Sequence, residues 1–406
     1  MKSAAKISLA VLTLVTVPAT LAATPPREEI LSFETHDGLT LQGILSLPKR
    51  GEGPFPGILL LHGSGLHDAD HELDIPFLDF TRGRQEHFKK LARFLSKKGY
   101  AVLRFNKRGA SFDHESDNPL LLLRSSYDDL VEDARNALLT LYAHPRVAAE
   151  PLIVWGWSEG TTIAPRLARD HPEVSLLVLM GPAARHFDEI LHYQIVERNV
   201  DFFHRAADEN RDGFVTFGEI DRLDGRGGVG SFYVHNLAEA LYGIDGEQIL
   251  AGAEINGFVE TLDGDRDGRL SVDQEIQPVY ETALLDLRRT IDDSNSVYEQ
   301  TLFQIRPLEE FVDRVKTPIV LVQGEADNQT AVIESERLIA KLKARGRDFE
   351  ALSFPGLGHS LSPMIDFYKD DGGLTTLDNP TGNVMKKRVM RTIEKAIRRN
   401  LRAPRR

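Results

Sequence analysis

The sequence predicts an α/β fold in which a mostly parallel sheet is covered by helices on both faces. Short apolar runs alternate with amphipathic helical segments up to Gly181-Pro182, and the alternation returns from Thr317-Pro318 onward. The runs at 57–61 and 176–180 are continuously apolar, which is typical of strands buried on both faces. Such strands occur where helices cover a parallel sheet on each side.

The expected strands occupy 30–34, 39–47, 57–61, 101–105, 152–155, 176–180, 319–322 and 349–354. Helices are expected at 88–98 and 127–143, between the strands at 152–155 and 176–180, after 322, and at the C-terminal end. The segment 127–143 places apolar residues on one helical face, as expected for a helix packed on a sheet. These residues are Leu130, Ala134, Ala137, Leu138 and Leu141.

Residues 184–316 interrupt this alternation. They are acidic and helical, and they contain no apolar run long enough for the sheet. Sheet proteins accept insertions at loops on the carboxyl side of their strands. We therefore expect a first core part at 24–183, a helical cap at 184–316 inserted after the sixth strand, and a second core part at 317–406. Because the cap is inserted on the carboxyl side of the strands, we expect it to lie over that edge of the sheet as a lid.

Residues 1–23 have the composition of a secretory leader. Lys2 and Lys6 precede an apolar stretch at 7–17, which Pro18 interrupts, and small residues surround a cleavage position after Ala22 or Ala23. An uncleaved anchor is the alternative. Because the chain has no cysteine, disulfides and thiolate metal sites are excluded. These features predict an exported protein of the bacterial periplasm or medium, with no transmembrane segment after the leader.

The charge distribution narrows the choice of partners. The net charge of −12 argues against a nucleic-acid partner. The C-terminal stretch 386–406 reverses the sign, with ten lysines and arginines and one acidic residue, Glu394. This basic helix could touch an anionic surface. The simpler interpretation is the solvated face of a last helix packed on the sheet, since helix C-termini favour cations.

A strand-to-helix turn at 156–160, Gly-Trp-Ser-Glu-Gly, is the most informative motif. It follows the apolar run 152–155 and precedes a helical segment. A G-x-S-x-G turn in this setting exposes its serine, here Ser158, at the carboxyl edge of a parallel sheet. A serine hydroxyl is a poor nucleophile unless a histidine takes its proton and a carboxylate orients that histidine.

Two later strand ends carry the expected partners in the order serine, acid, histidine. Asp327 follows the strand at 319–322, and His359 follows the strand at 349–354. We expect Asp327 to orient His359, and His359 to act as the base. Glu325 is the main alternative acid, and Asp188, after the preceding strand, is a weaker one.

Two backbone N–H groups are also expected near Ser158, to hold the negative oxygen that forms during attack on a carbonyl. One belongs to Glu159, which follows the serine. The other belongs to Ser64 or Gly63 in the glycine-rich turn that follows the strand at 57–61.

With these motifs the chain resembles α/β-hydrolases, and in particular bacterial carboxylesterases with a loop of the form HGSG-x-x-D-x-D-x-E. Residues 62–72 match that loop, and residues 106–109, Asn-Lys-Arg-Gly, match a second turn of the group. The resemblance covers about 28–183 and 317–400 and implies hydrolysis of a small-molecule ester through an acyl-serine. It also implies that Asp68, Asp70 and Arg108 hold loops by ion pairing.

Two segments of the insertion resemble the twelve-residue calcium loops of EF-hands. In the loop at 208–219 the expected ligands are Asp208, Asn210, Asp212, the Phe214 carbonyl, Thr216 and Glu219. In the loop at 263–274 they are Asp263, Asp265, Asp267, the Arg269 carbonyl, Ser271 and Gln274. Gln274 stands where a bidentate glutamate is expected, so weaker binding is predicted there. Val215 and Leu270 are expected to pair the two loops, and Ca²⁺ is expected to be structural.

The leading hypothesis is therefore a secreted serine carboxylesterase with a calcium-stabilised lid and no cofactor for its chemistry. Exopeptidase, acyl-aminoacyl peptidase and thioesterase activities use the same three side chains and stay open. A non-catalytic, calcium-dependent binding protein is the alternative from another class.

Overall fold

The computed structural model describes residues 27–73, 85–225, 237, 240, 261–362 and 385–402. The predicted leader at 1–23 lies outside the described residues. Within them, no helix is long and apolar enough to cross a membrane.

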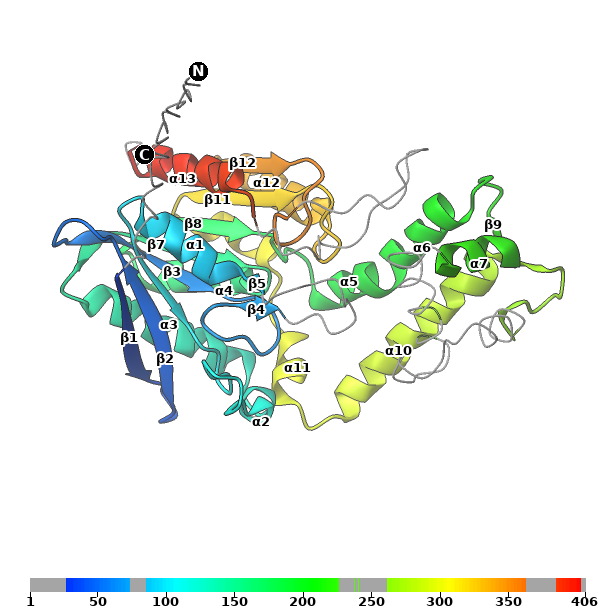
Figure 1. The fold of residues 1–406 in the computed structure, drawn as a ribbon, viewed down its shortest axis with the longest axis horizontal. Helices are drawn as coiled ribbons and strands as arrows, with labels where there is room; N and C mark the ends of the chain where they lie inside the picture. Colours follow the sequence, from blue (N-terminus) through cyan, green and yellow to red (C-terminus); the bar gives the residue numbers. More distant parts are fainter. Residues whose placement is uncertain are drawn as a thin grey trace, which may run out of the picture.

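An eight-stranded sheet forms the centre of the molecule (Figure 1). Its strands are β1 (Arg27–Glu34), β2 (Thr40–Leu47), β3 (Phe55–Leu61), β6 (Ala101–Phe105), β7 (Val147–Trp157), β8 (Val174–Met180), β11 (Ile319–Gly324) and β12 (Phe349–Phe354). The order across the sheet is β1-β2-β6-β3-β7-β8-β11-β12. The pairs β1–β2 and β2–β6 are antiparallel, and every pair from β6 to β12 is parallel. The predicted fold class is confirmed, with a strand at each predicted position.

Alternate residues of the central strands enter two separate cores, because successive side chains of a strand point to opposite faces. Leu59 and Leu61 pack with α3 (Tyr127–Ala143), α4 (Gly160–Asp170) and α12 (Val332–Ala344). Ile58 and Leu60 pack on the other face.

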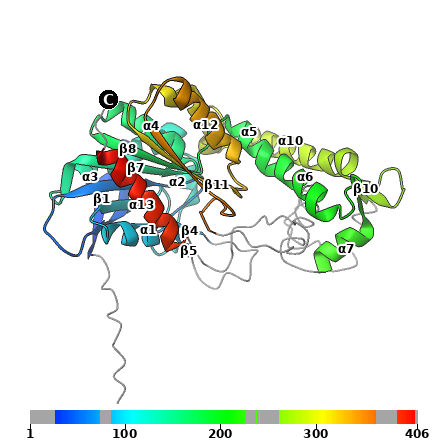
Figure 2. The same cartoon turned by 90° about the horizontal axis from the view of Figure 1, so that it is seen from above.

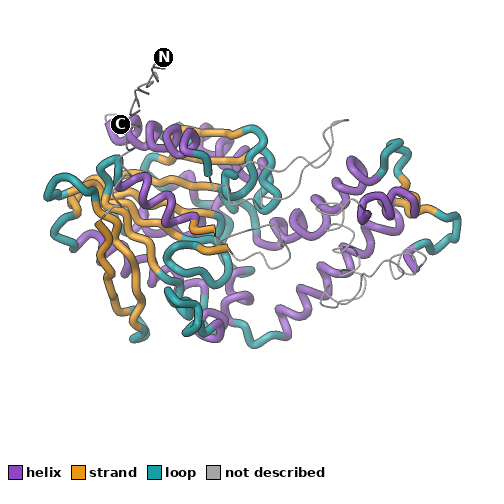
Figure 3. Tube along the Cα trace, viewed as in Figure 1, coloured by secondary structure: helices purple, strands orange, loops and turns teal. Residues whose placement is uncertain are grey.

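That second core is formed with α1 (His87–Ser96) and α13 (Lys387–Arg402). The helices cover the sheet on both sides, as Figure 3 shows. The start of α3 is fixed by a capping box between Ser126 and Asp129, in which each side chain accepts from the other residue's backbone N–H.

Small elements complete the core around the strand ends. The short strands β4 (Glu72–Leu73) and β5 (Gln85–Glu86) pair with each other, and α2 (Pro119–Leu123) precedes α3. After the insertion, two single 3₁₀ turns, η5 (Leu308–Glu310) and η6 (Val312–Arg314), return the chain to β11.

The described part of the insertion forms a two-legged helical arm that extends away from the sheet (Figures 1 and 2). The outgoing leg runs through α5 (Phe187–His192), η1 (Tyr193–Glu197), α6 (Arg198–Phe202) and η2 (Phe203–Ala207). The returning leg is η4 (Val272–Ile276) and α10 (Gln277–Asp293), followed by α11 (Val297–Leu302). The elements η1, η2 and η4 are single π-helical turns. The described residues form an arm rather than a cover folded over the sheet edge.

The two legs are joined along their length by polar contacts. Arg288 of α10 lies 2.6 Å from the Asp188 carboxylate of α5, and His204 of η2 lies 2.8 Å from the Asp273 carboxylate of η4. The arm therefore has its own lateral connections, independent of the sheet.

The tip of the arm has an apolar core of its own. Phe202, Phe203, Val215, Leu270 and Ile276 are buried against one another there. The strands β9 (Phe214–Thr216) and β10 (Arg269–Ser271) form an antiparallel pair in which Val215 lies opposite Leu270, and α7 (Phe217–Gly225) follows β9. The predicted pairing of the two acidic loops is confirmed.

Candidate active site

Ser158 lies at the carboxyl end of β7, and its backbone has a conformation typical of a tight turn. Its φ is +54°, in the left-handed region that side chains other than glycine rarely adopt. Its backbone N–H donates to the Met180 carbonyl at the end of β8, with an N–O distance of 2.9 Å. This hydrogen bond fixes the turn against the neighbouring strand and leaves the side chain half-buried.

The two glycines of the turn are sterically required. A Cβ at Gly156 would lie 2.2 Å from the Gly160 carbonyl oxygen, and a Cβ at Gly160 would lie 2.6 Å from the Leu61 carbonyl oxygen. Both approaches are to backbone atoms, which cannot move aside as a flexible side chain can. The G-x-S-x-G spacing is thus explained by contacts between β3, β7 and the start of α4.

His359 and Asp327 form a buried pair at the same edge of the sheet. The His359 Nδ1 atom lies 2.9 Å and 3.1 Å from the two carboxylate oxygens of Asp327. The same carboxylate accepts from the backbone N–H groups of Gln329 and Thr330, each at 2.8 Å, and from the Thr330 hydroxyl at 3.0 Å. These donors orient the carboxylate towards Nδ1, so Nε2 is the ring nitrogen that does not contact Asp327.

His359 and Ser158 are brought together by their immediate neighbours. The Trp157 indole N–H, one residue before Ser158, donates to the His359 carbonyl at 3.2 Å. A Cβ at Gly181 would lie 2.8 Å from the imidazole Cε1 atom, and Gly181 follows Met180, whose carbonyl holds the Ser158 N–H. The structure therefore places the hydroxyl and the imidazole at adjoining strand ends.

The two alternative acids have other partners. The Glu325 carboxylate accepts from the exposed Ser353 hydroxyl at 2.7 Å. Asp188 lies on α5 and pairs with Arg288 of the arm. Asp327 is therefore the candidate acid that contacts the histidine.

The loop after β3 lies directly against the serine. A Cβ at Gly63 would lie 3.2 Å from the Ser158 Cβ and 3.7 Å from its hydroxyl oxygen, so this backbone packs closely against Ser158. The Lys107 ammonium donates to the Gly63 carbonyl at 2.7 Å. Glu159 is buried beside this loop. The segments that carry the candidate oxyanion donors, at Glu159 and at Gly63 and Ser64, thus lie next to Ser158.

Ion pairs of Asp70 and Arg108 hold the loops behind the site, as the resemblance implied. Arg104 and Lys89 lie 2.8 Å and 2.9 Å from the Asp70 carboxylate. The buried Arg108 guanidinium lies 2.6 Å from Asp133 of α3. The Arg108 guanidinium also lies 2.9 Å from Asp37. Asp68 contributes its backbone carbonyl, which lies 2.9 Å from the His62 Nε2 atom.

The outgoing leg of the arm contacts the loop that carries Asp327. The Tyr193 hydroxyl donates to the Asp327 carbonyl at 2.9 Å, and the Gln194 amide donates to the Gln329 carbonyl at 2.8 Å. Arg198 donates to the Asn328 carbonyl, between them, at 3.0 Å. Three side chains of the outgoing leg therefore donate hydrogen bonds to the carbonyls of three successive residues, the first of which is the candidate acid.

A cluster of four histidines beside the serine strand was not predicted. The rings of His67 and His71 stack with their centres 4.1 Å apart. The centre of the His71 ring lies 4.4 Å from that of Trp157 and 5.4 Å from that of His62. The centre of the His87 ring lies 5.3 Å from that of Trp157. The motifs recognised in the sequence assign no role to these histidines. The close spacing of His62, His67 and His71 in one glycine-rich loop was the available signal.

The cluster is held uncharged by its surroundings. Burial, with the positive charge of Lys107 as the next cause, lowers the pKa of His67 to about 4. Burial and the charge of Lys90 lower the pKa of His87 to about 3. Burial and neighbouring imidazoles hold the pKa of His62 and of His71 well below their ordinary value.

At the tip of the arm, the first acidic loop is wound around convergent carboxylates. The backbone N–H groups of Asp212 and Gly213 donate to the buried Asp208 carboxylate at 3.1 Å and 2.7 Å. The Glu219 carboxylate accepts from the Thr216 and Glu209 N–H groups at 2.7 Å and 3.1 Å, so it closes the loop.

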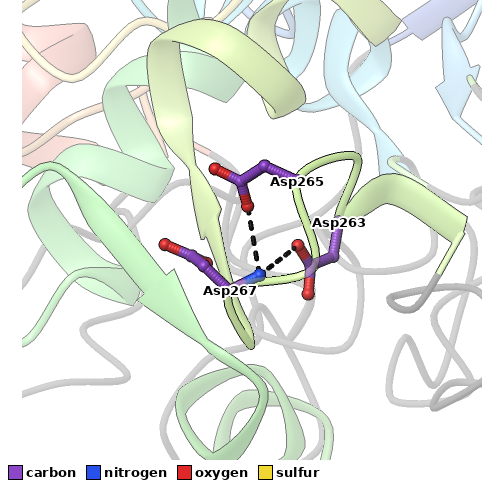
Figure 4. A group of neighbouring side chains, drawn as sticks. All are labelled: Asp263, Asp265 and Asp267. Atoms are coloured by element: carbon purple, nitrogen blue, oxygen red, sulfur yellow. Dashed lines mark hydrogen bonds between the residues drawn. The ribbon is translucent and has the colours of Figure 1, made fainter.

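The second loop repeats this winding (Figure 4). The Asp267 N–H donates to the carboxylates of Asp263 and Asp265, each at 3.1 Å. Carboxylate oxygens of these three aspartates lie within 4.8 Å of one another. Such a set of oxygen donors fits a hard cation such as Ca²⁺.

The expectation that Gln274 occupies the last ligand position of this loop is corrected by the structure. Glu275 closes the loop, because its carboxylate accepts from the Ser271 and Gly264 N–H groups, each at 2.8 Å. These donors correspond to Thr216 and Glu209 of the first loop. The π-helical turn η4 contains one more residue per turn than an α-helix and so brings Glu275 to the position of Glu219. Gln274 is exposed.

Two sequence families match parts of the chain. The family described as serine aminopeptidase, S33, matches residues 80–207, and the prolyl oligopeptidase family matches residues 277–368. Neither matched range includes residues 208–276, where the two acidic loops lie. The esterase EstD of Thermotoga maritima is 33% identical over 167 residues, which cover 40% of this chain and 36% of that esterase. The match thus spans about a third of the relative's length.

Two solved structures are similar to this chain over most of its length. An acylaminoacyl peptidase of Pyrococcus horikoshii aligns with a TM-score of 0.45 and 14% identity, over 83% of this chain and 38% of that one. The esterase Pf2001 of Pyrococcus furiosus aligns with a TM-score of 0.42 and 16% identity, over 81% and 82%.

The strand order and the left-handed serine after β7 give this chain the α/β-hydrolase fold. Over the matched residues its sequence is similar to a serine aminopeptidase family, to the prolyl oligopeptidase family and to an esterase.

The histidine cluster predicts a stability that falls on acidification. Between about pH 6.5 and the lowered folded-state pKa values, the unfolded chain binds protons that the folded chain does not, so the free energy of unfolding decreases as pH falls. We expect the free energy of unfolding of His71→Phe, which keeps a stacked ring, to fall less steeply on acidification than that of the wild type. Between pH 6 and 4 the two slopes should differ by about 1 kcal/mol per pH unit. Urea unfolding at several pH values measures this, and parallel pH curves for the two proteins would contradict it.

Proposed function

We propose that this protein hydrolyses carboxylic esters of small molecules through an acyl-serine intermediate. The observation that carries the proposal is the left-handed Ser158 at the end of β7, with the buried His359–Asp327 pair at the adjoining strand end. A strained serine turn is stable only where its surroundings hold it, and such strain concentrates at functional sites.

In the proposed reaction, the Ser158 hydroxyl oxygen attacks the ester carbonyl carbon while the His359 imidazole takes the hydroxyl proton. Asp327 keeps the Nδ1 hydrogen in place and stabilises the imidazolium that forms. The negative carbonyl oxygen is held by the N–H of Glu159 and an N–H of the 63–64 turn. When the carbon–oxygen bond to the leaving alcohol breaks, His359 returns the proton to that alcohol, and water then releases the acid by the same steps in reverse order.

Ester substrates are favoured by the 33% identity shared with the Thermotoga maritima esterase over 167 residues. The matches to two peptidase families support an exopeptidase or acyl-aminoacyl peptidase as the second candidate. Thioesters would use the same groups. A non-catalytic binding protein has no physical need for a buried His–Asp pair beside a strained serine.

We also propose that the arm tip binds Ca²⁺ at both loops and that the ions are structural. The donors would be Asp208, Asn210, Asp212, Phe214, Thr216 and Glu219 in the first loop, and Asp263, Asp265, Asp267, Arg269, Ser271 and Glu275 in the second. Repulsion between clustered carboxylates opposes the loop conformation, and a divalent cation would remove that repulsion. Because β9 and β10 pair, ordering one loop supports the other.

Export to the periplasm or medium is proposed from the leader at 1–23. An exported protein meets millimolar calcium, which suits structural rather than signalling sites. The basic face of α13 is proposed as a weak contact for anionic surfaces. Arg399 of that helix is already paired with Glu350, which reduces the charge available.

Loss of the nucleophile is the direct test of the enzyme proposal. We expect wild-type protein to be labelled by a fluorophosphonate and to hydrolyse p-nitrophenyl esters of short or medium acyl chains, and Ser158→Ala to lose both. A parallel panel of aminoacyl anilides and acyl-thioesters identifies the preferred leaving group. Folded wild-type protein that takes no label would rule out the enzyme, and label retained by Ser158→Ala would rule out this serine.

Exchange of the acid separates Asp327 from Glu325. Asp327→Asn removes the charge that stabilises the imidazolium, so we expect kcat to fall by at least about a hundredfold. The matched change Glu325→Gln, at the exposed neighbour, should leave kcat within about twofold, since its partner is Ser353. Steady-state ester hydrolysis measures both, and a larger loss in Glu325→Gln would reverse the assignment.

The second calcium loop is tested by two adjacent substitutions. Calorimetric titration of the wild type should show two bound Ca²⁺ ions per chain, with a rise in Tm. Glu275→Gln should lose or weaken one ion and reduce that rise, whereas Gln274→Ala should behave as the wild type. A deficit in Gln274→Ala with normal binding by Glu275→Gln would restore Gln274 as the ligand, and an unchanged wild-type Tm with and without chelator would remove calcium altogether.

A further inference from the structure

Tyr298, on α11 at the end of the returning leg, reaches the residue that follows the nucleophile. Its hydroxyl donates to the Glu159 carboxylate, and it accepts from the Gly65 N–H at 3.4 Å. Tyr298 and Glu159 are both buried. One side chain of the insertion thus contacts both segments from which the oxyanion donors are expected.

Lys107 makes a second connection between the same two segments. Its ammonium donates to the Gly63 carbonyl at 2.7 Å and to the other carboxylate oxygen of Glu159 at 2.9 Å. The side chains of Lys107 and Glu159 are 6% and 1% exposed, so this ion pair is removed from solvent. The Lys107 ammonium also lies 5.7 Å from the centre of the Tyr298 ring. Three side chains from β6, β7 and α11 ends therefore form one buried network.

The charge of this network matters because of where it lies. The Glu159 carboxylate belongs to the residue whose N–H is placed in the oxyanion hole, so an uncompensated negative charge there would repel the oxygen that becomes negative during attack. In a water-poor site such repulsion is large compared with its value in water. Lys107 compensates the charge. Burial and the nearby carboxylate raise the pKa of Tyr298 well above its ordinary value, so its hydroxyl stays a donor.

We infer that Tyr298, Lys107 and the Glu159 carboxylate are positioning residues that hold the two halves of the oxyanion hole in register and keep its surroundings electrically neutral. The insertion, through Tyr298, is then part of the catalytic machinery. The inference rests on the proposed hydrolase function. It adds Tyr298, which no sequence motif contains, and gives side-chain roles to Lys107 and Glu159.

The first test replaces the hydroxyl of Tyr298. We expect Tyr298→Phe to lower kcat about tenfold with KM changed less than twofold, because a displaced donor costs less than the roughly 10²–10³-fold loss of a missing one. Affinity for an aliphatic trifluoromethyl ketone, whose serine adduct places an oxyanion in the hole, should fall in parallel with kcat/KM. The matched control is Tyr100→Phe, which removes a buried hydroxyl contact to Glu394 of α13, in the core on the opposite face of the sheet from Tyr298. It should lower Tm similarly with kcat unchanged.

The second test concerns the charge balance. Lys107→Met leaves the Glu159 carboxylate without its cation, so kcat should fall more than in Tyr298→Phe. Adding Glu159→Gln to Lys107→Met removes the repelling charge and should restore kcat at least about fivefold over the single variant. A purely structural role would make the double variant no more active than Lys107→Met.

The outcomes separate this inference from the proposed function. Wild-type protein without ester hydrolysis or fluorophosphonate labelling would remove the proposed function itself. An active wild type in which Tyr298→Phe and Lys107→Met, both folded by Tm, keep wild-type kcat and inhibitor affinity would overturn the network alone.

Discussion

The left-handed backbone of Ser158 is the constraint on which the site depends. A non-glycine residue in this conformation costs roughly 1–3 kcal/mol, which the surrounding structure must offset. Three strand ends provide this offset. The Met180 carbonyl of β8 accepts from the Ser158 N–H, the Leu61 carbonyl of β3 packs against Gly160, and β7 ends in the turn that contains Gly156. The strand order β3-β7-β8 is therefore the arrangement that makes the turn stable as well as the one that places a loop on each side of the serine.

The insertion contacts the site from both of its legs. Its outgoing leg holds the three carbonyls of the Asp327 loop, and its returning leg ends in α11, where Tyr298 reaches Glu159. The orientation of the acid and the geometry around the serine thus depend on the same pair of helices. An arm cross-linked along its length, with its own apolar core at the tip, is a stiff support for such contacts.

The parts of this protein that follow from short sequence patterns were predictable. Buried parallel strands are continuous apolar runs, so their positions could be recognised, and the candidate triad follows from which residues stand after each strand. Val215 opposite Leu270 followed from the loop motif. The ligand position of Glu275 did not, because a fixed twelve-residue spacing assumes an α-helical turn where the chain forms a π-helical one. The packing of the histidines against Trp157 and the contact between Tyr298 and Glu159, 139 residues apart, depend on tertiary structure that no local pattern encodes.

The insertion leaves the core and returns to it at nearly the same place. The Glu309 N–H donates to the Ala184 carbonyl at 3.0 Å, and the buried Glu334 carboxylate accepts from the Ala184 and Arg185 N–H groups at 2.9 Å and 3.0 Å. Because this closed neck fixes both ends, lengthening the excursion beyond it costs only about 0.6 kcal/mol for each doubling. The far end of the arm can therefore be lengthened or shortened without disturbing the strand order. Its outer loops are for the same reason suitable attachment points for a fused module.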